Sequence, residues 1–430
     1  MYKNCNFEDK LSNNVTEINK HQFKLTKNLI KETINLLIQR RPDIITDKWE
    51  ENIKIETVGI PRCTTIINEN AFRASSKLKK IIIPDTVQEI KNGAFEFCSS
   101  LTDIEIPNSV TKIGECAFCG CSSLGKITIP NNVSEIGIKA FADCQTLRNI
   151  IFVIPNSVKI ITESTFHQFS SLANIRIPNS VTEICAFAYS GCSSLTDIEI
   201  PTSVTKIGHD TFSECSSLTD IIIPNSVTKI CDFIFKECSS LIRITIPNSV
   251  KKIGEYAFNK CKSLTNITIP NSVTEIGKYI FLECSKLKDI TIPNSVTEIG
   301  KYIFLECSKL KDVTIPNSVS EIGEGSFSYC ISLSDITIPN SVRIIDNSTF
   351  LRCSSLSDIT IPNGVTEIGN SAFTECSKLT SISISNTVIK VGDISISNTA
   401  LKIVHHIQIL QFQIVLLKFV LLLFLDVHHL

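Results

Sequence analysis

Apolar residues recur along this chain with a period of 23 residues, and most positions between them are polar. Fourteen successive units, each counted from a proline, carry isoleucine at position 7 and leucine at position 18. Position 12 is phenylalanine in every unit except one, which has Tyr189. The first unit begins at Pro61 and the last at Pro362, and only the step from Pro130 to Pro155 is longer, at 25 residues. A fixed short period predicts a solenoid, in which each unit buries its apolar face against its neighbours.

The pattern within one unit predicts short elements. The segment Leu-x-x-Ile-x-Ile-Pro, for example Leu264 to Pro270, alternates apolar and polar residues and predicts a strand that ends at the proline, which has no N–H to donate. Asn-Ser after the proline and glycine at position 8 indicate turns. Apolar residues at positions 11, 12, 15 and 18 have the spacing i, i+1, i+4, i+7, which predicts a short helical turn. We therefore expect a strand, a turn, an extended arm and a helical turn in each unit.

The complete unit, P-N-S-V-T-E-I-G-x-x-A-F-x-x-C-S-x-L-x-x-I-x-I, resembles the BspA-like (Treponema pallidum type) leucine-rich repeat. The resemblance covers the chain from Pro61 to about Ile384. It implies an α/β solenoid, a curved stack of about fourteen 23-residue units with a parallel β-sheet on its concave face. It also implies a protein without enzymatic activity that takes part in adhesion or protein binding on bacterial or protist cell surfaces.

One departure from the general leucine-rich pattern concerns the turn after each proline. Serine or another small residue, as at Ser109, Ser272 and Ser341, replaces the asparagine that normally forms a ladder there. A different pattern of turn hydrogen bonds is therefore expected.

The repeat divides the chain into three parts. Residues 1–55 are interpreted as an N-terminal capping region with an amphipathic helix at Thr26–Arg41, and a basic helix that binds a membrane surface or a partner is the alternative. Residues 56–384 form the solenoid, and residues 385–430 are a degenerate repeat followed by a hydrophobic tail. Residues 407–425 have the length of a membrane span, but Lys418 makes insertion costly. A membrane anchor, a cap and a tail without a selected role all stay open.

The cysteines indicate a reduced core rather than a disulfide scaffold. Twelve of the eighteen occupy position 15, and the two other units have Ser75 and Phe169 there. A position that accepts phenylalanine is apolar, and a buried free cysteine behaves as a small hydrophobic residue. Reduced thiols and the polar segment Met1–Asn14, which lacks a signal sequence, favour the cytoplasm, whereas the family resemblance favours the cell surface. Localisation is left between the two.

Composition and motifs favour no catalytic chemistry. The formal charge of −1, from 42 basic and 43 acidic residues, supplies no overall basic character for nucleic-acid binding. Cys116-x-x-Cys119-x-Cys121 is the only local cysteine cluster, and neither a second cysteine pair nor a histidine lies nearby in the sequence, so no metal site is expected. There is no phosphate-binding loop, dinucleotide fingerprint or nucleophile elbow, and we expect no catalytic residues and no cofactor.

The outward positions 20 and 22 of each strand are the best candidates for binding, because they vary while the core does not. A solvated polar face is the simpler interpretation of the same residues. The two extra residues between Leu147 and Pro155 predict a bulge that places Phe152 on the surface beside Arg176. The candidate residues on the concave face are Asp103, Glu105, Phe152, Arg176, Glu199, Arg243, Asp289 and Asp312.

These observations favour a non-enzymatic scaffold for protein–protein interaction or adhesion, associated with the cell surface. The expected partner is a protein ligand, with no nucleic acid and with membrane association through residues 407–425 as an open alternative. The alternative function is an intracellular leucine-rich-repeat scaffold without membrane contact.

Overall fold

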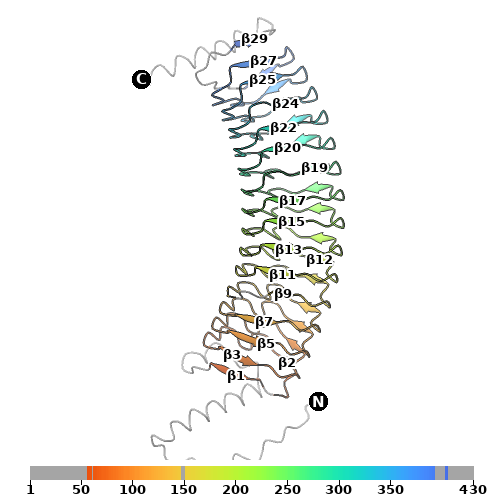
Figure 1. Cartoon of the computed structure of the whole chain (residues 1–430), viewed down its shortest axis with the longest axis vertical. Helices are drawn as coiled ribbons and strands as arrows, with labels where there is room; N and C mark the ends of the chain where they lie inside the picture. Colours follow the sequence, from red (N-terminus) through yellow and green to blue (C-terminus); the bar gives the residue numbers. More distant parts are fainter. Residues whose placement is uncertain (1–55, 61, 147–150, 393–401, 405–430) are drawn as a thin grey trace, which may run out of the picture.

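The computed structural model describes residues 56–60, 62–146, 151–392 and 402–404. These residues form a bent stack of similar turns, which runs from β1 at one end to β29 at the other (Figure 1). Most turns contribute a strand to each of two parallel rows, so ladders of backbone hydrogen bonds run along two sides of the stack, whereas the turn that contains Asp335 contributes no strand to the first row. The repeat pattern in the sequence therefore corresponds to a solenoid, as expected.

The first row contains the strands at positions 20–22, and its outward residues are called the strand face below. Its members are β1 (Thr57–Gly59), β3 (Lys80–Ile82), β5 (Asp103–Glu105), β7 (Lys126–Thr128), β9 (Ile151–Val153), β11 (Asn174–Arg176), β13 (Asp197–Glu199), β15 (Asp220–Ile222), β17 (Arg243–Thr245), β20 (Asp289–Thr291), β22 (Asp312–Thr314), β25 (Asp358–Ile361), β27 (Ser381–Ile384) and β29 (Lys402–Val404). In the unit of Leu264 to Pro270 the expected strand is reduced to one bridge, between Asn266 and Asp289.

The second row contains two-residue strands from the extended arm. Its members are β2 (Ile66–Ile67), β4 (Glu89–Ile90), β6 (Lys112–Ile113), β8 (Glu135–Ile136), β10 (Ile160–Ile161), β12 (Glu183–Ile184), β14 (Lys206–Ile207), β16 (Lys229–Ile230), β18 (Lys252–Ile253), β19 (Glu275–Ile276), β21 (Glu298–Ile299), β23 (Glu321–Ile322), β24 (Ile344–Ile345), β26 (Glu367–Ile368) and β28 (Lys390–Val391). Paired strands in both rows are parallel, and each residue pairs with the one 23 positions later, for example Asp103 with Lys126, except between β27 and β29, where Ser381 pairs with Lys402.

The expected helical turn is absent from the described residues, so the α/β class is corrected there to an all-β solenoid. Positions 10 and 14 of all fourteen units have left-handed φ angles between 52° and 75°, which interrupt any α-helix. The N–H groups of Gly93, Phe95 and Phe97 donate to carbonyls of the following turn, at 2.7–2.8 Å, and not to carbonyls four residues back. Consecutive β-turns place the same apolar residues inward as a helix would, which is why the sequence spacing suggested one.

A column of aromatic rings fills the core of the stack. Thirteen successive ring pairs connect Phe72 to Phe373 through Tyr189, with centroids 5.3–6.0 Å apart and planes within 15° of parallel. All of these rings are buried. Each ring therefore contacts both neighbouring turns, and the core is continuous along the stack.

The cysteines at position 15 are buried beside this column, in the apolar positions expected from the sequence. Each thiol donates a hydrogen bond to the carbonyl of position 12 in the preceding turn, as from Cys98 Sγ to Phe72 O at 2.9 Å and from Cys238 Sγ to Phe212 O at 3.0 Å. Burial raises the pKa of Cys376 to about 12, so this thiol is protonated at neutral pH and can donate. Cysteine thus combines a small apolar volume with a donor that connects adjacent turns.

Serine hydroxyls connect adjacent turns at the other end of the strand. Ser180 and Ser249 donate to the carbonyls of Val158 and Val227, at 2.7 and 2.6 Å, and Ser109 donates to Val87. In contrast, the buried hydroxyls of Ser272 and Ser341 have no hydrogen-bond partner within the part of the chain that the structure describes.

Several expectations for the two ends fall outside the described residues, including the helix at Thr26–Arg41 and the hydrophobic segment 407–425. At the C-terminal end, β28 and β29 continue the two rows beyond residue 384. Among the described residues, no helix has the length and apolar character needed to cross a membrane.

Candidate functional site

The strand face is a regular surface on which the outward residues vary between units. In most strands of the first row the central residue is buried and its two neighbours are exposed, because successive side chains of a strand point to opposite sides. Asp103 and Glu105 lie on β5, Arg176 on β11, Glu199 on β13, Arg243 on β17, Asp289 on β20 and Asp312 on β22, and all seven are exposed.

Phe152 lies on β9, whose register with β11 identifies its neighbours, and its place on the surface stays a prediction. Phe152 is paired with the buried Ile175, whereas Val153 is paired with Arg176. Val153 is therefore the exposed apolar residue beside Arg176, at 50% exposure. The pairing of β9 with β11 is regular, so the two extra residues of this unit are accommodated before β9, where residues 147–150 are outside the described chain.

The structure distributes the predicted residues along the stack. Asp103 lies between Lys80 and Lys126 in the register, Arg176 is opposite Glu199, and Asp289 is opposite Asp312. Adjacent parallel strands are about 5 Å apart, so the six repeats between β5 and β17 correspond to roughly 30 Å. The predicted residues therefore do not form one compact site.

A shallow hollow lies on the strand face over β13, β15 and β17. Its volume is about 680 Å³, and it is lined by Thr196, Asp197, Thr219, Asp220, Ile221, Ile222, Arg243, Ile244 and Thr245. Arg243 Nε donates to Asp220 Oδ1 at 2.8 Å, and this hydrogen bond and the charge of Asp220 raise the pKa of Arg243. Ile222 is 71% exposed beside this ion pair. The hollow thus combines an apolar side chain with a paired charge, an arrangement suited to a protein surface of mixed polarity.

Sequence analysis identified Arg243 in this hollow but missed Asp220 and Ile222, and it also missed Ile242, which precedes Arg243 and does not line the hollow. Ile242 is 44% exposed, and its N–H donates to the carbonyl of Thr219, which lines the hollow. A signal was available, since position 22 is threonine in the six units from Thr245 to Thr360, whereas Ile222 places an apolar side chain at the same outward position.

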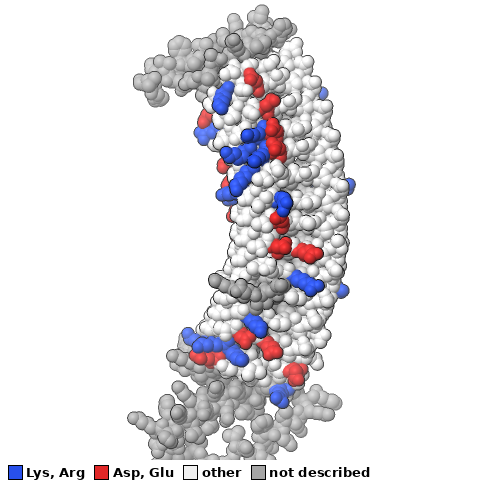
Figure 2. Space-filling view, viewed as in Figure 1, with Lys and Arg blue, Asp and Glu red and all other residues white. Residues whose placement is uncertain are grey.

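Charges are more regular towards the C-terminal end of the stack. Figure 2 shows basic and acidic side chains gathered in adjoining groups there. Exposed aspartates occupy position 20 of four successive units, and exposed lysines occupy positions 17 and 19 of two of these units. These residues are Asp289, Asp312, Asp335 and Asp358, and Lys286, Lys288, Lys309 and Lys311. The units that begin at Pro270 and Pro293 differ only at Ile290 and Val313, so the repeated charges are also consistent with duplication.

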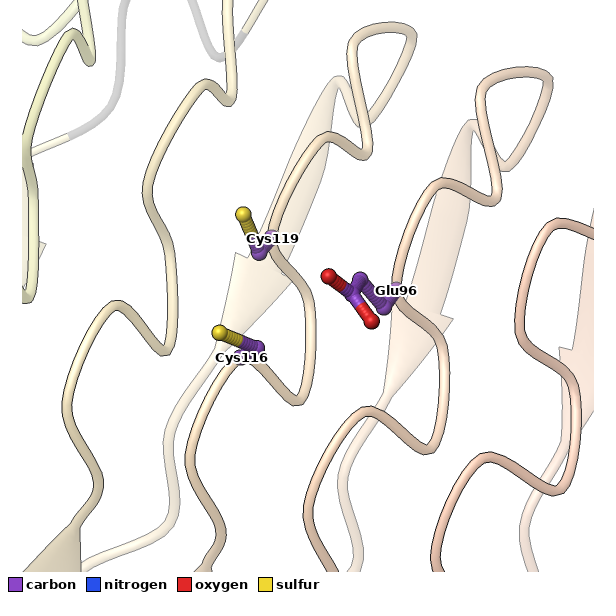
Figure 3. A group of neighbouring side chains, drawn as sticks. All are labelled: Glu96, Cys116 and Cys119. Carbon is purple, nitrogen blue, oxygen red and sulfur yellow. The ribbon is translucent and has the colours of Figure 1, made fainter.

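A second cluster lies in the turns that replace the expected helix. Glu96, Cys116 and Cys119 offer three donor atoms that all lie within 4.8 Å of one another. In Figure 3 the Glu96 side chain extends from its own turn towards the turn that carries the two cysteines. Burial, followed by the nearby Cys116 sulfur, raises the pKa of Cys119 to about 12, so this thiol is a poor nucleophile at neutral pH. Sequence analysis missed Glu96 because it comes from the preceding repeat.

Comparison with known proteins agrees with this architecture. A family model described as BspA type Leucine rich repeat region matches residues 1–101, 43–153, 150–242, 228–356 and 299–412. No curated protein matches the chain.

Three solved structures illustrate the similarity. A leucine-rich repeat protein from Bacteroides ovatus is 30% identical, covers 78% of this chain and 91% of its own, and has a TM-score of 0.62. A leucine rich cell surface protein from Faecalibacterium prausnitzii is 30% identical, covers 84% and 90% of the two chains, and has a TM-score of 0.44. The T. pallidum leucine rich repeat protein is 34% identical, covers 36% and 72%, and has a TM-score of 0.35.

Proposed function

The chain belongs to the BspA type leucine-rich repeat family, which is typical of protein–protein interaction scaffolds, and we propose that it binds a protein ligand through the hollow over β13, β15 and β17. The role is non-enzymatic. Binding at this surface requires no cofactor, because affinity comes from the burial of apolar area and from charge complementarity.

The exposure of Ile222 is the observation that carries this proposal. Ile222 is 71% exposed, more than Ile82 at 56% and Val153 at 50%, which occupy the same outward position of β3 and β9, so its apolar side chain is available for burial by a partner. Arg243 and Asp220 lie next to it, and arginine is enriched among the residues that dominate binding energy. Arg176 and Glu199 on the preceding strands extend the charged border of the hollow. An apolar centre with a polar rim is the usual composition of a protein interface.

We also propose that this binding serves adhesion at a cell surface, as the family resemblance implies. The alternative is an intracellular scaffold without membrane contact, which the buried thiols that donate hydrogen bonds along the described stack support. Protease treatment of intact cells separates the two. Cleavage of the chain from outside supports surface adhesion, and full protection with cleavage only after lysis supports the intracellular alternative.

Membrane association through residues 407–425 is a further proposal. If this segment anchors the chain, deletion of residues 405–430 transfers the protein from membrane to soluble fractions without lowering the stability of the stack. If the segment is a cap, the same deletion weakens the last repeats and leaves the partition of the protein unchanged.

Paired substitutions test the binding surface. Ile222→Asp places a charge in the hollow, and Thr314→Asp introduces the same charge at the equivalent outward position of β22. We expect Ile222→Asp to abolish capture of the ligand by the full chain, while Thr314→Asp retains it. Equal capture by both variants would show that the ligand binds elsewhere.

A further inference from the structure

The turn that carries Cys116 and Cys119 is held firmly between its two neighbours. Cys119 N donates to Cys116 O at 3.1 Å, which closes a tight turn that brings both side chains together. Cys116 N donates to Ile138 O in the following repeat at 2.8 Å, and Phe97 N in the preceding repeat donates to Cys119 O at 2.7 Å. The positions of the two cysteines are thus fixed by backbone hydrogen bonds on both sides. Among the fourteen units, this is the only one with cysteine at both position 10 and position 13.

Glu96 supplies a third donor from the preceding repeat. It occupies the same position of its unit as Cys119, 23 residues earlier, so the stacking of turns places its carboxylate beside the two sulfurs. Arg73 Nε donates to Glu96 Oε2 at 2.8 Å, and the Glu96 side chain is only 15% exposed. A hydrogen bond of this kind orients a carboxylate and is typical of the residues that support metal ligands.

We propose that Glu96, Cys116 and Cys119 form a binding site for Zn²⁺, with water as the fourth ligand. Two sulfurs and one carboxylate oxygen are ligands that Zn²⁺ prefers, and three protein ligands leave one open position. Tetrahedral donors at normal Zn–S and Zn–O lengths lie about 3.5–3.8 Å apart. The three donor atoms already lie within 4.8 Å, so small side-chain rotations bring them to this spacing.

The charges of the site balance when the ion is bound. Both thiols release their protons to solvent as the two Zn–S bonds form, which gives two thiolates beside the Glu96 carboxylate. These three negative charges are offset by the two charges of Zn²⁺ and by the Arg73 guanidinium. The bound ion connects two successive repeats through Glu96 on one side and the cysteines on the other. This site lies in the turns and is separate from the strand face.

Titration of the reduced full-length chain with Co²⁺, which reports thiolate ligation by a charge-transfer absorption, tests the proposal. We expect one Co²⁺ per chain with this absorption, and its displacement by Zn²⁺. The absorption is lost in Cys116→Ser and in Cys119→Ser, and it is retained in the control Cys185→Ser, which changes a half-buried thiol outside the cluster. Glu96→Gln lowers the affinity for Zn²⁺ at least tenfold, and Arg73→Gln lowers it by about tenfold or more through the loss of carboxylate orientation.

Three results would overturn the proposal. The first is that the reduced chain gives no thiolate absorption with Co²⁺. The second is that this absorption is unchanged in the Cys116→Ser and Cys119→Ser variants. The third is that both variants still bind one metal ion per chain, as expected if the metal is bound by the histidines at 405, 406, 428 and 429 instead. Circular dichroism and melting of each variant verify that the stack is folded. Glu96→Gln keeps the test decisive if a cysteine variant fails to fold, because it leaves both thiols in place.

Discussion

Truncation of one ring in the aromatic column probes how the stack is stabilised. The Phe212 side chain is fully buried, and its ring lies 5.6 Å from Tyr189 and 5.7 Å from Phe235, with planes 2° and 5° from parallel. Phe→Ala substitution at buried sites costs about 3–5 kcal/mol. Each aromatic pair contributes about 0.5–1.5 kcal/mol beyond area burial, so the loss of two pairs places Phe212→Ala near the upper end of that range.

Native-state hydrogen exchange measures this cost locally. A loss of 3–5 kcal/mol corresponds to exchange faster by roughly a hundredfold to several thousandfold for amides that open with this turn, since about 1.4 kcal/mol is a factor of ten. The effect should decline in repeats further from Phe212, because each repeat contacts only its neighbours. Phe97→Ala is the matched control, as Phe97 is 49% exposed and its truncation should change stability by less than about 1 kcal/mol. Equal effects of the two substitutions would refute the continuous aromatic core.

Three further outcomes follow from the contacts between turns. Cys238→Ala should lower the free energy of unfolding in urea by about 1–2 kcal/mol, because the thiol no longer donates to Phe212 O. Strong reductant should leave the wild-type melting temperature unchanged. A large drop of the melting temperature in reductant would indicate disulfides instead. The hydrogen bond from Tyr302 to Glu324 raises the pKa of Tyr302 to about 12. The stabilisation of the fold by this hydrogen bond is therefore complete below about pH 10 and is lost as the pH rises through about 12. Ultraviolet titration should show one fewer late-ionising phenol in Glu324→Gln than in the wild type. Arg243→Gln should leave the melting temperature unchanged, because the Arg243–Asp220 ion pair is exposed, but it should weaken capture of the ligand. Unchanged capture would show that Arg243 is not part of the interface.

The fold was largely predictable because repetition reveals which positions are internal. The recurring isoleucine, phenylalanine and leucine positions identified the core. Phe169 occupies position 15, where twelve other units have cysteine, and this substitution identified position 15 as apolar. The helical turn was wrong, because an i, i+1, i+4, i+7 spacing fits both a helix and a series of β-turns. The difference lies in the left-handed residues at positions 10 and 14, which are glycine at only four places and otherwise include residues such as Phe97 and Cys116, so glycine marks them only sparsely.

The sites were less predictable, because they depend on contacts between repeats. Glu96 and Cys119 are 23 residues apart in the sequence and adjacent in the stack, so they are found only when the units are aligned one above another. Val153 was missed as the exposed neighbour of Arg176 because the insertion was interpreted as a bulge within the strand, whereas the register of β9 with β11 is regular. Ile222 was missed because apolar residues recur in this varied column, as at Ile82 and Val153, and only the exposure of each side chain distinguishes them.

Site-specific photo-cross-linking tests most directly whether the hollow over β13, β15 and β17 binds a protein. A photoreactive amino acid is placed at Thr245, which is paired with Ile222 in the register, and in a second chain at Thr314, the equivalent outward position of β22. The account predicts a discrete cross-linked protein from the Thr245 position, its loss when Ile222→Asp is added, and no such product from the Thr314 position. Cross-linking of the same protein at equal yield from both positions, or its persistence in the Ile222→Asp background, would contradict the assignment of this hollow as the binding surface.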